Sequence, residues 1–260
     1  MISSLMSIEE ENNQDSSTPS ETDQSGPDQP PPGEPGFPLY TYLLTACIVA
    51  VAIVQFTTDG SIWETGRSTH MTGFIKDNFR HGEYWRILTG ATAHVNIIHI
   101  FFNSMALVSF GKLIEMLSNR AHLVTVFLIS AIGGGIMSLI LNPQGNSVGA
   151  SGGIIGLLGY LVVYSMRRKQ FLAPEFRRSL LFNTGFIVVY GIALYQLIDN
   201  YAHLGGFLAG AAYALVQVPG DPHVDPRPVG AAGELAGLVS LGIFIAASIF
   251  SILILTGLVL

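Results

Sequence analysis

The chain has 260 residues, of which 49% are hydrophobic and only 12% are charged. Soluble domains carry about 25% charged residues, so this composition argues against an ordinary soluble enzyme and favours a protein with several membrane-spanning helices. The net charge of −6 arises in the first 38 residues, which hold eight acids and no Lys or Arg. We expect a lipid bilayer around the remainder and no nucleic-acid partner.

Residues 1–38 form a tail rich in Ser, Pro, Glu, Asp and Gln, with almost no apolar residue after Ile8. Such a segment buries too little surface to offset its ordering entropy, so we expect it to be disordered. It also lacks the basic start and apolar core of a signal peptide.

Seven apolar runs follow the tail and predict an all-α, polytopic membrane helix bundle. The segment 58–93 mixes aromatic and charged residues, as loops in the membrane interface do, and 219–234 reads as a linker. Prolines fall outside or between the runs, as helix sterics require. The predicted spanning helices are 39–57, 94–117, 121–142, 151–166, 179–198, 201–218 and 235–260.

The distribution of basic residues predicts the orientation of these helices. The short loop 167–178 contains five Lys or Arg residues, which predicts a cytoplasmic location. Alternation then places the N-terminus and the linker 219–234 in the cytoplasm and the loop 58–93 outside. Ser151 and His203 would both lie at the outward ends of their helices.

Three polar clusters interrupt the apolar runs and suggest a catalytic site. Ser151 lies among glycines at the start of one run, and His203 lies near the start of another, so the two form a candidate nucleophile and base. His99 and Asn103 are four residues apart on one helix face and are candidate donors to an oxyanion. His94 lies off that face. The alternative is that these groups only join helices by hydrogen bonds.

Glycines predict a close contact between the fourth and sixth spanning helices. Gly152 begins a stripe of small residues in the fourth helix, and Gly206-x-x-x-Gly210 is a close-approach motif in the sixth. Gly206 shares the face of His203, whereas Gly205 is expected to point elsewhere. This contact would bring His203 to Ser151.

Other ionisable residues suggest supporting roles. Asp199 lies one turn before His203, where we expect it to favour the helix N-terminus near water and not to complete a catalytic triad. Glu115, beside Lys112, fits a hydrogen-bond anchor at the cytoplasmic end. His94 and His99 are five residues apart with no acid between them, so we expect no metal site and no cofactor.

These features resemble the rhomboid intramembrane serine proteases over residues 39–218. The matching residues are Trp85, Arg86, His94, His99, Asn103, Glu115, Gly149, Ser151, Gly152, His203, Gly206 and Gly210. The resemblance implies a six-helix core, here with an added C-terminal helix at 235–260. It further implies a Ser151–His203 dyad without a third acidic member, and an oxyanion hole formed by His99, Asn103 and the backbone N–H of Ser151.

The resemblance also implies a function and a location. The substrates would be transmembrane segments of other membrane proteins, cut near their outer ends. The membrane would be a bacterial inner membrane or a eukaryotic secretory or surface membrane. One departure is Ile155, where family members often carry an aromatic residue that stacks on the catalytic histidine. The alternatives are a catalytically silent binding protein or chaperone for membrane helices, and a transporter, which the lack of two similar halves disfavours.

Overall fold

A computed structural model describes residues 36–193, 198–221 and 223–259. Contacts divide the chain into Met1–Pro35 and Gly36–Leu260, and only the second unit is described below. The predicted disordered tail therefore lies almost entirely outside the described residues and stays a prediction.

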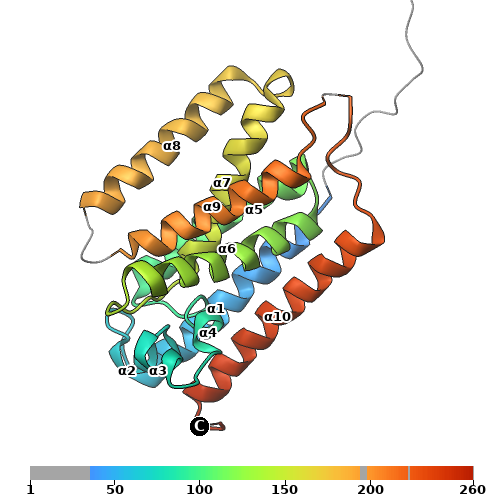
Figure 1. Cartoon of the computed structure of the whole chain (residues 1–260). Helices are drawn as coiled ribbons and strands as arrows, with labels where there is room; N and C mark the ends of the chain where they lie inside the picture. Colours follow the sequence, from blue (N-terminus) through green and yellow to red (C-terminus); the bar gives the residue numbers. More distant parts are fainter. Residues whose placement is uncertain (1–35, 194–197, 222, 260) are drawn as a thin grey trace, which may run out of the picture. The chain divides into compact units, whose positions relative to one another are not determined.

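Seven long helices correspond to the seven predicted runs (Figure 1). They are α1 (Leu39–Asp59), α5 (Ile97–Leu117), α6 (Arg120–Leu141), α7 (Ser151–Arg167), α8 (Pro174–Ala193), α9 (Asn200–Gln217) and α10 (Ala231–Leu255). Within the predicted interfacial loop, the chain forms three short helices, α2 (Gly66–Thr72), α3 (Lys76–Arg80) and α4 (Arg86–Thr89). A 3₁₀ turn, Lys169–Phe171, joins α7 to α8.

Apart from the end of α8, which borders residues outside the described part of the chain, four helix ends differ from the sequence prediction by three or more residues. α10 begins at Ala231 and not at Leu235, so the predicted linker 219–234 is shorter than expected, and the other three differences have local reasons. α5 begins at Ile97 and not at His94, because the side chain of Asn96 caps it by accepting a hydrogen bond from the His99 N–H at 2.9 Å. α8 begins at Pro174, a residue suited to the first helical position. α10 ends at Leu255 because Gly257 adopts a left-handed conformation (φ 72°) that closes the helix.

The length and hydropathy of the helices support an integral membrane protein. Among the described residues, α1, α5, α6 and α10 are long and apolar enough to cross a membrane, and α7 is a shorter apolar helix. A spanning helix satisfies its backbone hydrogen bonds internally, which the hydrocarbon core requires. The chain is therefore a multi-pass helical membrane protein.

The glycines of α9 pack directly on the backbone of α7. A Cβ built at Gly206 would meet the Cα of Gly152 at 3.2 Å, and one at Gly210 would meet the Cα of Gly156 at 2.8 Å. Close backbone approach is how helices associate in lipid, where burial of apolar surface gives little drive. The predicted contact between the fourth and sixth spanning helices is confirmed.

Gly205 faces away from the α7 contact, as expected, yet it too lies in a close helix contact. It packs against α6, where a Cβ would meet the carbonyl oxygen of Gly133 at 2.6 Å. Both faces of the first turns of α9 are therefore in backbone contact, and α9 is held between α6 and α7.

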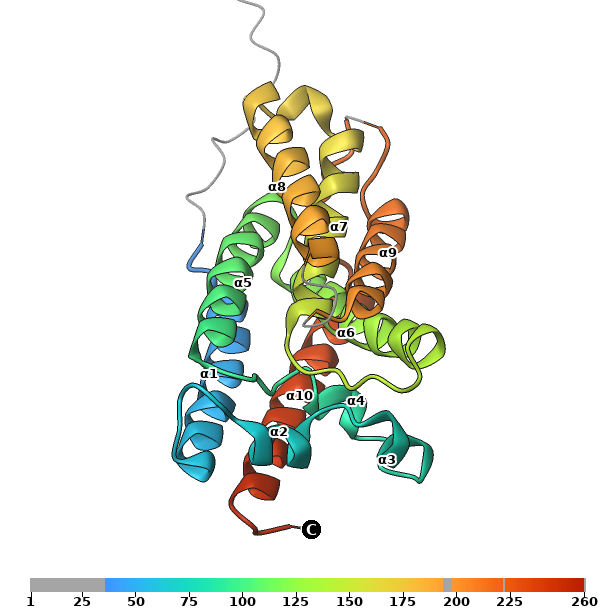
Figure 2. The same ribbon diagram turned by 90° about the vertical axis from the view of Figure 1, so that its left-hand side faces the viewer.

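The C-terminal helix α10 packs on α1 and α6 (Figure 2). Gly237 lies against Ala121, and the rings of Phe127 and Phe244 meet edge to face with centroids 5.0 Å apart. At its other end, Ser251 hydrogen-bonds Thr92 at 2.9 Å. The seventh spanning helix is thus part of the packed unit.

We expect Gly210→Ala to destabilise the bundle and Gly242→Ala to leave it unchanged. The first substitution forces a methyl group into the backbone of α7, and overpacking of this kind costs about 1–3 kcal/mol. The second adds a methyl group in α10 where no atom lies within 4 Å. Thermal unfolding of both variants in detergent tests this, and equal melting temperatures would contradict the assigned α7–α9 contact.

Candidate active site

The loop before Ser151 places this residue at the start of α7. Phe74 and Ser147 pair as an isolated antiparallel bridge, and the N–H of Gly149 donates to the carbonyl of Gly90 at 2.8 Å. Gly149 has φ 121°, which favours glycine, and a Cβ there would meet Nε2 of His99 at 2.9 Å. Glycine is therefore needed at 149 for both backbone conformation and space.

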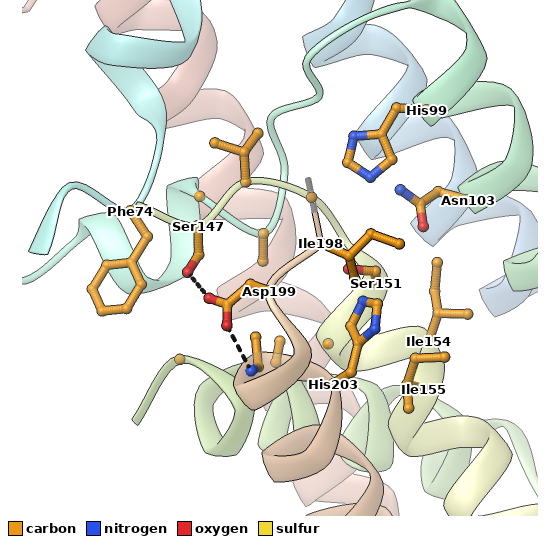
Figure 3. Close-up of a pocket in the computed structure, with 18 of the residues that line it drawn as sticks. Phe74, His99, Asn103, Ser147, Ser151, Ile154, Ile155, Ile198, Asp199 and His203 are labelled. Carbon is orange, nitrogen blue, oxygen red and sulfur yellow. Dashed lines mark hydrogen bonds between the residues drawn. The ribbon is translucent and has the colours of Figure 1, made fainter. Parts of the chain in front are cut away.

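His203 lies in the first turn of α9 and lines the same pocket as Ser151. Figure 3 shows the His203 ring beside Ser151. No hydrogen bond joins the two side chains in the part of the chain that the structure describes. Catalytic hydrogen bonds are often long in the absence of substrate, so this geometry is compatible with a nucleophile and its base.

His99 and Asn103 face the pocket from α5, opposite Ser151 and His203 (Figure 3). Nδ1 of His99 and Nδ2 of Asn103 are buried, and neither has a hydrogen-bond partner among the described residues. A buried polar group without a partner costs about 1–3 kcal/mol, so such groups are uncommon in folded proteins. Both ring nitrogens of His94, outside the pocket, also lack partners in the described part of the chain, so it is the place of His99 and Asn103 in the pocket lining that makes them candidate donors to a bound group.

His94 stands behind His99 and is not part of the pocket lining. Its side chain is fully buried, and its ring meets the His99 ring at a centroid distance of 5.0 Å and an angle of 65°. Its backbone is fixed by Gln55, whose Oε1 accepts from the His94 N–H at 2.9 Å. His94 can therefore orient His99 without reaching the pocket.

The pocket has a volume of about 300 Å³ and lies between α5, α6, α7 and α9. Its walls are mostly apolar, with Phe74 and Ile87 contributed by the segment between α1 and α5. Ile154 and Ile155 lie close to His203, so aliphatic packing takes the place of an aromatic ring at position 155 (Figure 3).

Three other residues singled out from the sequence, Trp85, Arg86 and Glu115, are not among the residues that line the pocket. Arg86 donates to the carbonyl oxygens of His70, Met71 and Gly73 and to Glu83, so it holds the segment between α1 and α5 together. Trp85 packs edge to face on Phe250 of α10. Glu115 accepts hydrogen bonds from the N–H and hydroxyl of Thr41 in α1, which agrees with the expected anchor.

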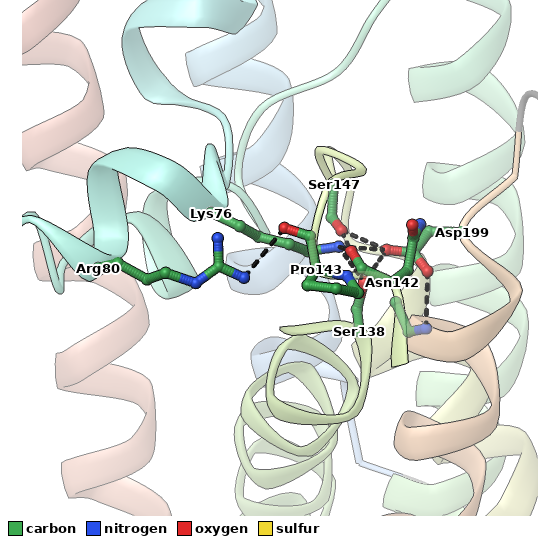
Figure 4. A network of polar contacts seen from close by, with 8 residues as sticks. Lys76, Arg80, Ser138, Asn142, Pro143, Ser147 and Asp199 are labelled. Atoms are coloured by element: carbon green, nitrogen blue, oxygen red, sulfur yellow. Dashed lines mark hydrogen bonds and ion pairs between the residues drawn. The ribbon is translucent and has the colours of Figure 1, made fainter. Parts of the chain in front are cut away.

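Asp199 caps α9 as expected, and it also belongs to a polar cluster that the sequence did not reveal (Figure 4). Its Oδ1 accepts from the N–H of Ala202 at 3.1 Å, and its Oδ2 accepts from the hydroxyls of Ser138 and Ser147. Lys76 lies 3.8 Å from the same oxygen. Burial alone would raise the pKa of Asp199, but the hydrogen bonds from Ser138 and Ser147 hold that pKa below its usual value.

The chain matches the family model for the Rhomboid domain over residues 81–220. It is 34% identical to the Rhomboid protease GluP of Bacillus subtilis (strain 168) over 188 residues, which are 69% of this chain and 35% of that protein. It is 33% identical to RHOMBOID-like protein 1 of Arabidopsis thaliana over 130 residues, 49% of this chain and 33% of that protein.

A third relative is closer to this chain in length. The putative rhomboid protease YdcA of Bacillus subtilis (strain 168) is 28% identical over 175 residues, which are 67% of this chain and 85% of that protein. By contrast, the matched part of this chain spans only about a third of the length of GluP and RHOMBOID-like protein 1. The family model covers more than half of the chain. It includes the four candidate catalytic residues that line the pocket, which are His99, Asn103, Ser151 and His203. The chain belongs to the rhomboid family.

Proposed function

We propose that the chain is an intramembrane serine endopeptidase that cleaves transmembrane segments of other membrane proteins. The observation that carries the proposal is one pocket that holds a serine and a histidine on one side and unpaired donors on the other. Relatives named as rhomboid proteases support the same reaction class. In this reading, residues 39–218 are the protease core, 219–230 is a linker and α10, Ala231–Leu255, is an added spanning helix.

The reaction begins at Ser151, whose hydroxyl is a weak nucleophile until a base removes its proton. His203 takes this proton as Oγ attacks the carbonyl carbon of the scissile peptide bond. The C–N bond then breaks, and His203 gives the proton to the departing amine. Water hydrolyses the acyl-enzyme by the same steps, with His203 again as base and then as acid.

The oxyanion formed in each step would lie between α5 and the start of α7. His99 and Asn103 donate from one side, and the N–H of Ser151 donates from the other, since the first N–H groups of a helix have no intrahelical partner. The unpaired Nδ2 of Asn103 fits this role, because the transition state supplies the partner that the resting pocket lacks. Each such donor in soluble serine proteases lowers the barrier by about 2.7–4 kcal/mol.

The proposed orientation puts the N-terminus in the cytoplasm and the pocket near the outer face. α7 has 17 residues, which is about 25 Å at ~1.5 Å per residue. A hydrocarbon core is about 30 Å thick, so Ser151 would lie a few ångströms below its outer boundary if Arg167 marks the inner one. Cleavage would then fall near the outer end of a substrate helix, where water is close.

We expect Ser151→Ala to reduce cleavage of a model transmembrane substrate by at least about a thousandfold, because members of a catalytic pair act as a unit. The assay uses purified protein in detergent, with product size resolved by electrophoresis. His203→Ala should reduce cleavage to the same extent. The matched control is His223→Ala, which changes an exposed histidine and should cleave at the wild-type rate. If Ser151→Ala binds the substrate and neither it nor the wild type cleaves, the chain is a binding protein and the proposal is wrong.

We expect opposite labelling of two exposed glutamines after their exchange for cysteine. Gln144→Cys and Gln170→Cys, in a Cys47→Ser background, lie at opposite ends of α7 and are both exposed. On intact cells, a membrane-impermeant thiol reagent should modify position 144 and spare position 170, because the basic loop 167–178 resists translocation. Modification at 170 with protection at 144 would invert the orientation and the predicted side of cleavage.

A further inference from the structure

A buried ion pair lies at the edge of the pocket, whose lining includes Asp199 and Ser147, and it uses residues that the proposed reaction leaves unassigned. The ammonium group of Lys76 donates to Oγ of Ser138 at 2.6 Å and to the carbonyl of Asn142 at 2.8 Å. It lies 3.8 Å from Oδ2 of Asp199, and the side chains of Lys76 and Asp199 are 1% and 13% exposed. Figure 4 shows these groups converging from α3, α6, the loop before α7 and the start of α9.

Burying a lysine in this way is costly unless its charge and its donors are satisfied. Lys76 meets both conditions, since it donates two hydrogen bonds and has a carboxylate nearby. Arg80, one turn further along α3, provides a contrast. It is more exposed, and among the described residues its side chain hydrogen-bonds only the carbonyl of Pro143, at 3.0 Å. The two cations on one short helix are therefore in different environments.

Asp199 joins this ion pair to the helix that carries His203. Its Oδ1 caps α9 through the N–H of Ala202, and its carbonyl oxygen accepts from the N–H of His203 at 3.1 Å. A capping residue fixes where the first helical turn begins. The position of Asp199 thus sets the position of the His203 backbone.

The other carboxylate oxygen reaches the loop that leads to Ser151. Ser147, whose hydroxyl donates to Oδ2 of Asp199, precedes Ser151 by four residues. Asp199 likewise precedes His203 by four residues. One carboxylate therefore bridges the turn before the nucleophile and the turn before the base.

We propose that Asp199, held by Ser147 and Ser138 and neutralised by Lys76, is a positioning residue that fixes Ser151 and His203 relative to each other. The inference rests on the proposed protease function. The carboxylate acts through the backbone turns that it joins, and among the described residues it makes no hydrogen bond to the His203 ring. Its role differs from that of a third triad member, which would orient the imidazole directly.

The key variant is Ser147→Ala, which removes the bridge to the nucleophile loop and leaves the charge of Asp199 in place. Small misplacements of reacting groups cost up to about a hundredfold in rate, so we expect kcat to fall about 10- to 100-fold with KM within about twofold. Ser147→Thr keeps the hydroxyl and should restore kcat. Lys76→Met should also lower kcat, and Arg80→Met, the matched loss of a cation from α3, should match wild type.

Rates are measured at saturating and limiting substrate, per folded protein, at a temperature well below the unfolding of each variant. A double-mutant cycle completes the experiment. If Ser147 acts through Asp199, Ser147→Ala combined with Asp199→Ala should be no slower than Asp199→Ala alone.

Three outcomes would overturn the inference. If Ser147→Ala kept the wild-type kcat, Asp199 would act by its charge alone and would not position Ser151 through Ser147. This would hold even if Lys76→Met lowered kcat. Full additivity in the cycle would show that Ser147 acts independently of Asp199. Equal losses in Lys76→Met and Arg80→Met would remove the role of the ion pair. In each case wild type would still cleave and Ser151→Ala would not, whereas cleavage by Ser151→Ala at the wild-type rate would refute the proposed function itself.

Discussion

The close approach of α7 and α9 is the constraint on which the site depends. Gly206 lies on the backbone of Gly152, and Gly210 lies on that of Gly156, so the two helices touch without intervening side chains. In a bilayer this contact is stabilised by packing, because lipid offers apolar surface everywhere else. Ser151 begins one helix and His203 lies in the first turn of the other, so the contact brings both into one pocket. A side chain at position 206 would separate them.

Two sets of polar side chains lie at this end of the bundle. The first set joins helices and loops to one another: Lys76 and Asp199 form an ion pair, and both make hydrogen bonds with serines, Lys76 with Ser138 and Asp199 with Ser138 and Ser147. The second set faces the pocket and includes buried nitrogens without partners among the described residues, in His99 and Asn103. Unpaired polar groups are costly in an apolar setting. Unpaired buried nitrogens also occur outside the pocket, for example in His94, but those of His99 and Asn103 belong to residues of the pocket lining, where a bound peptide could supply the partner.

Much of this arrangement could be predicted from the sequence, because membrane helices are recognised as apolar runs and glycines indicate where two helices pack closely. The seven helices and the α7–α9 contact followed from these two signals, whereas Ser151, His203, His99 and Asn103 stood out as polar residues within apolar runs. Helix ends were less predictable, since they depend on single residues such as the cap Asn96 and the left-handed Gly257. The cluster around Asp199 was missed because its members are separated by about sixty residues and have no periodicity. In the sequence, Lys76 is only one of the charged residues of the predicted interfacial loop 58–93.

The central claim is that His203 activates Ser151 inside this pocket, and covalent labelling with a fluorophosphonate tests it most directly. Such a reagent reacts with a serine only when a base activates the hydroxyl. Intact and peptide mass measurements on the full chain in detergent give both the extent and the position of labelling. The account predicts one adduct, on the peptide that contains Ser151, and its loss in folded His203→Ala. An adduct on another residue, or equal labelling of Ser151 in His203→Ala, would contradict it.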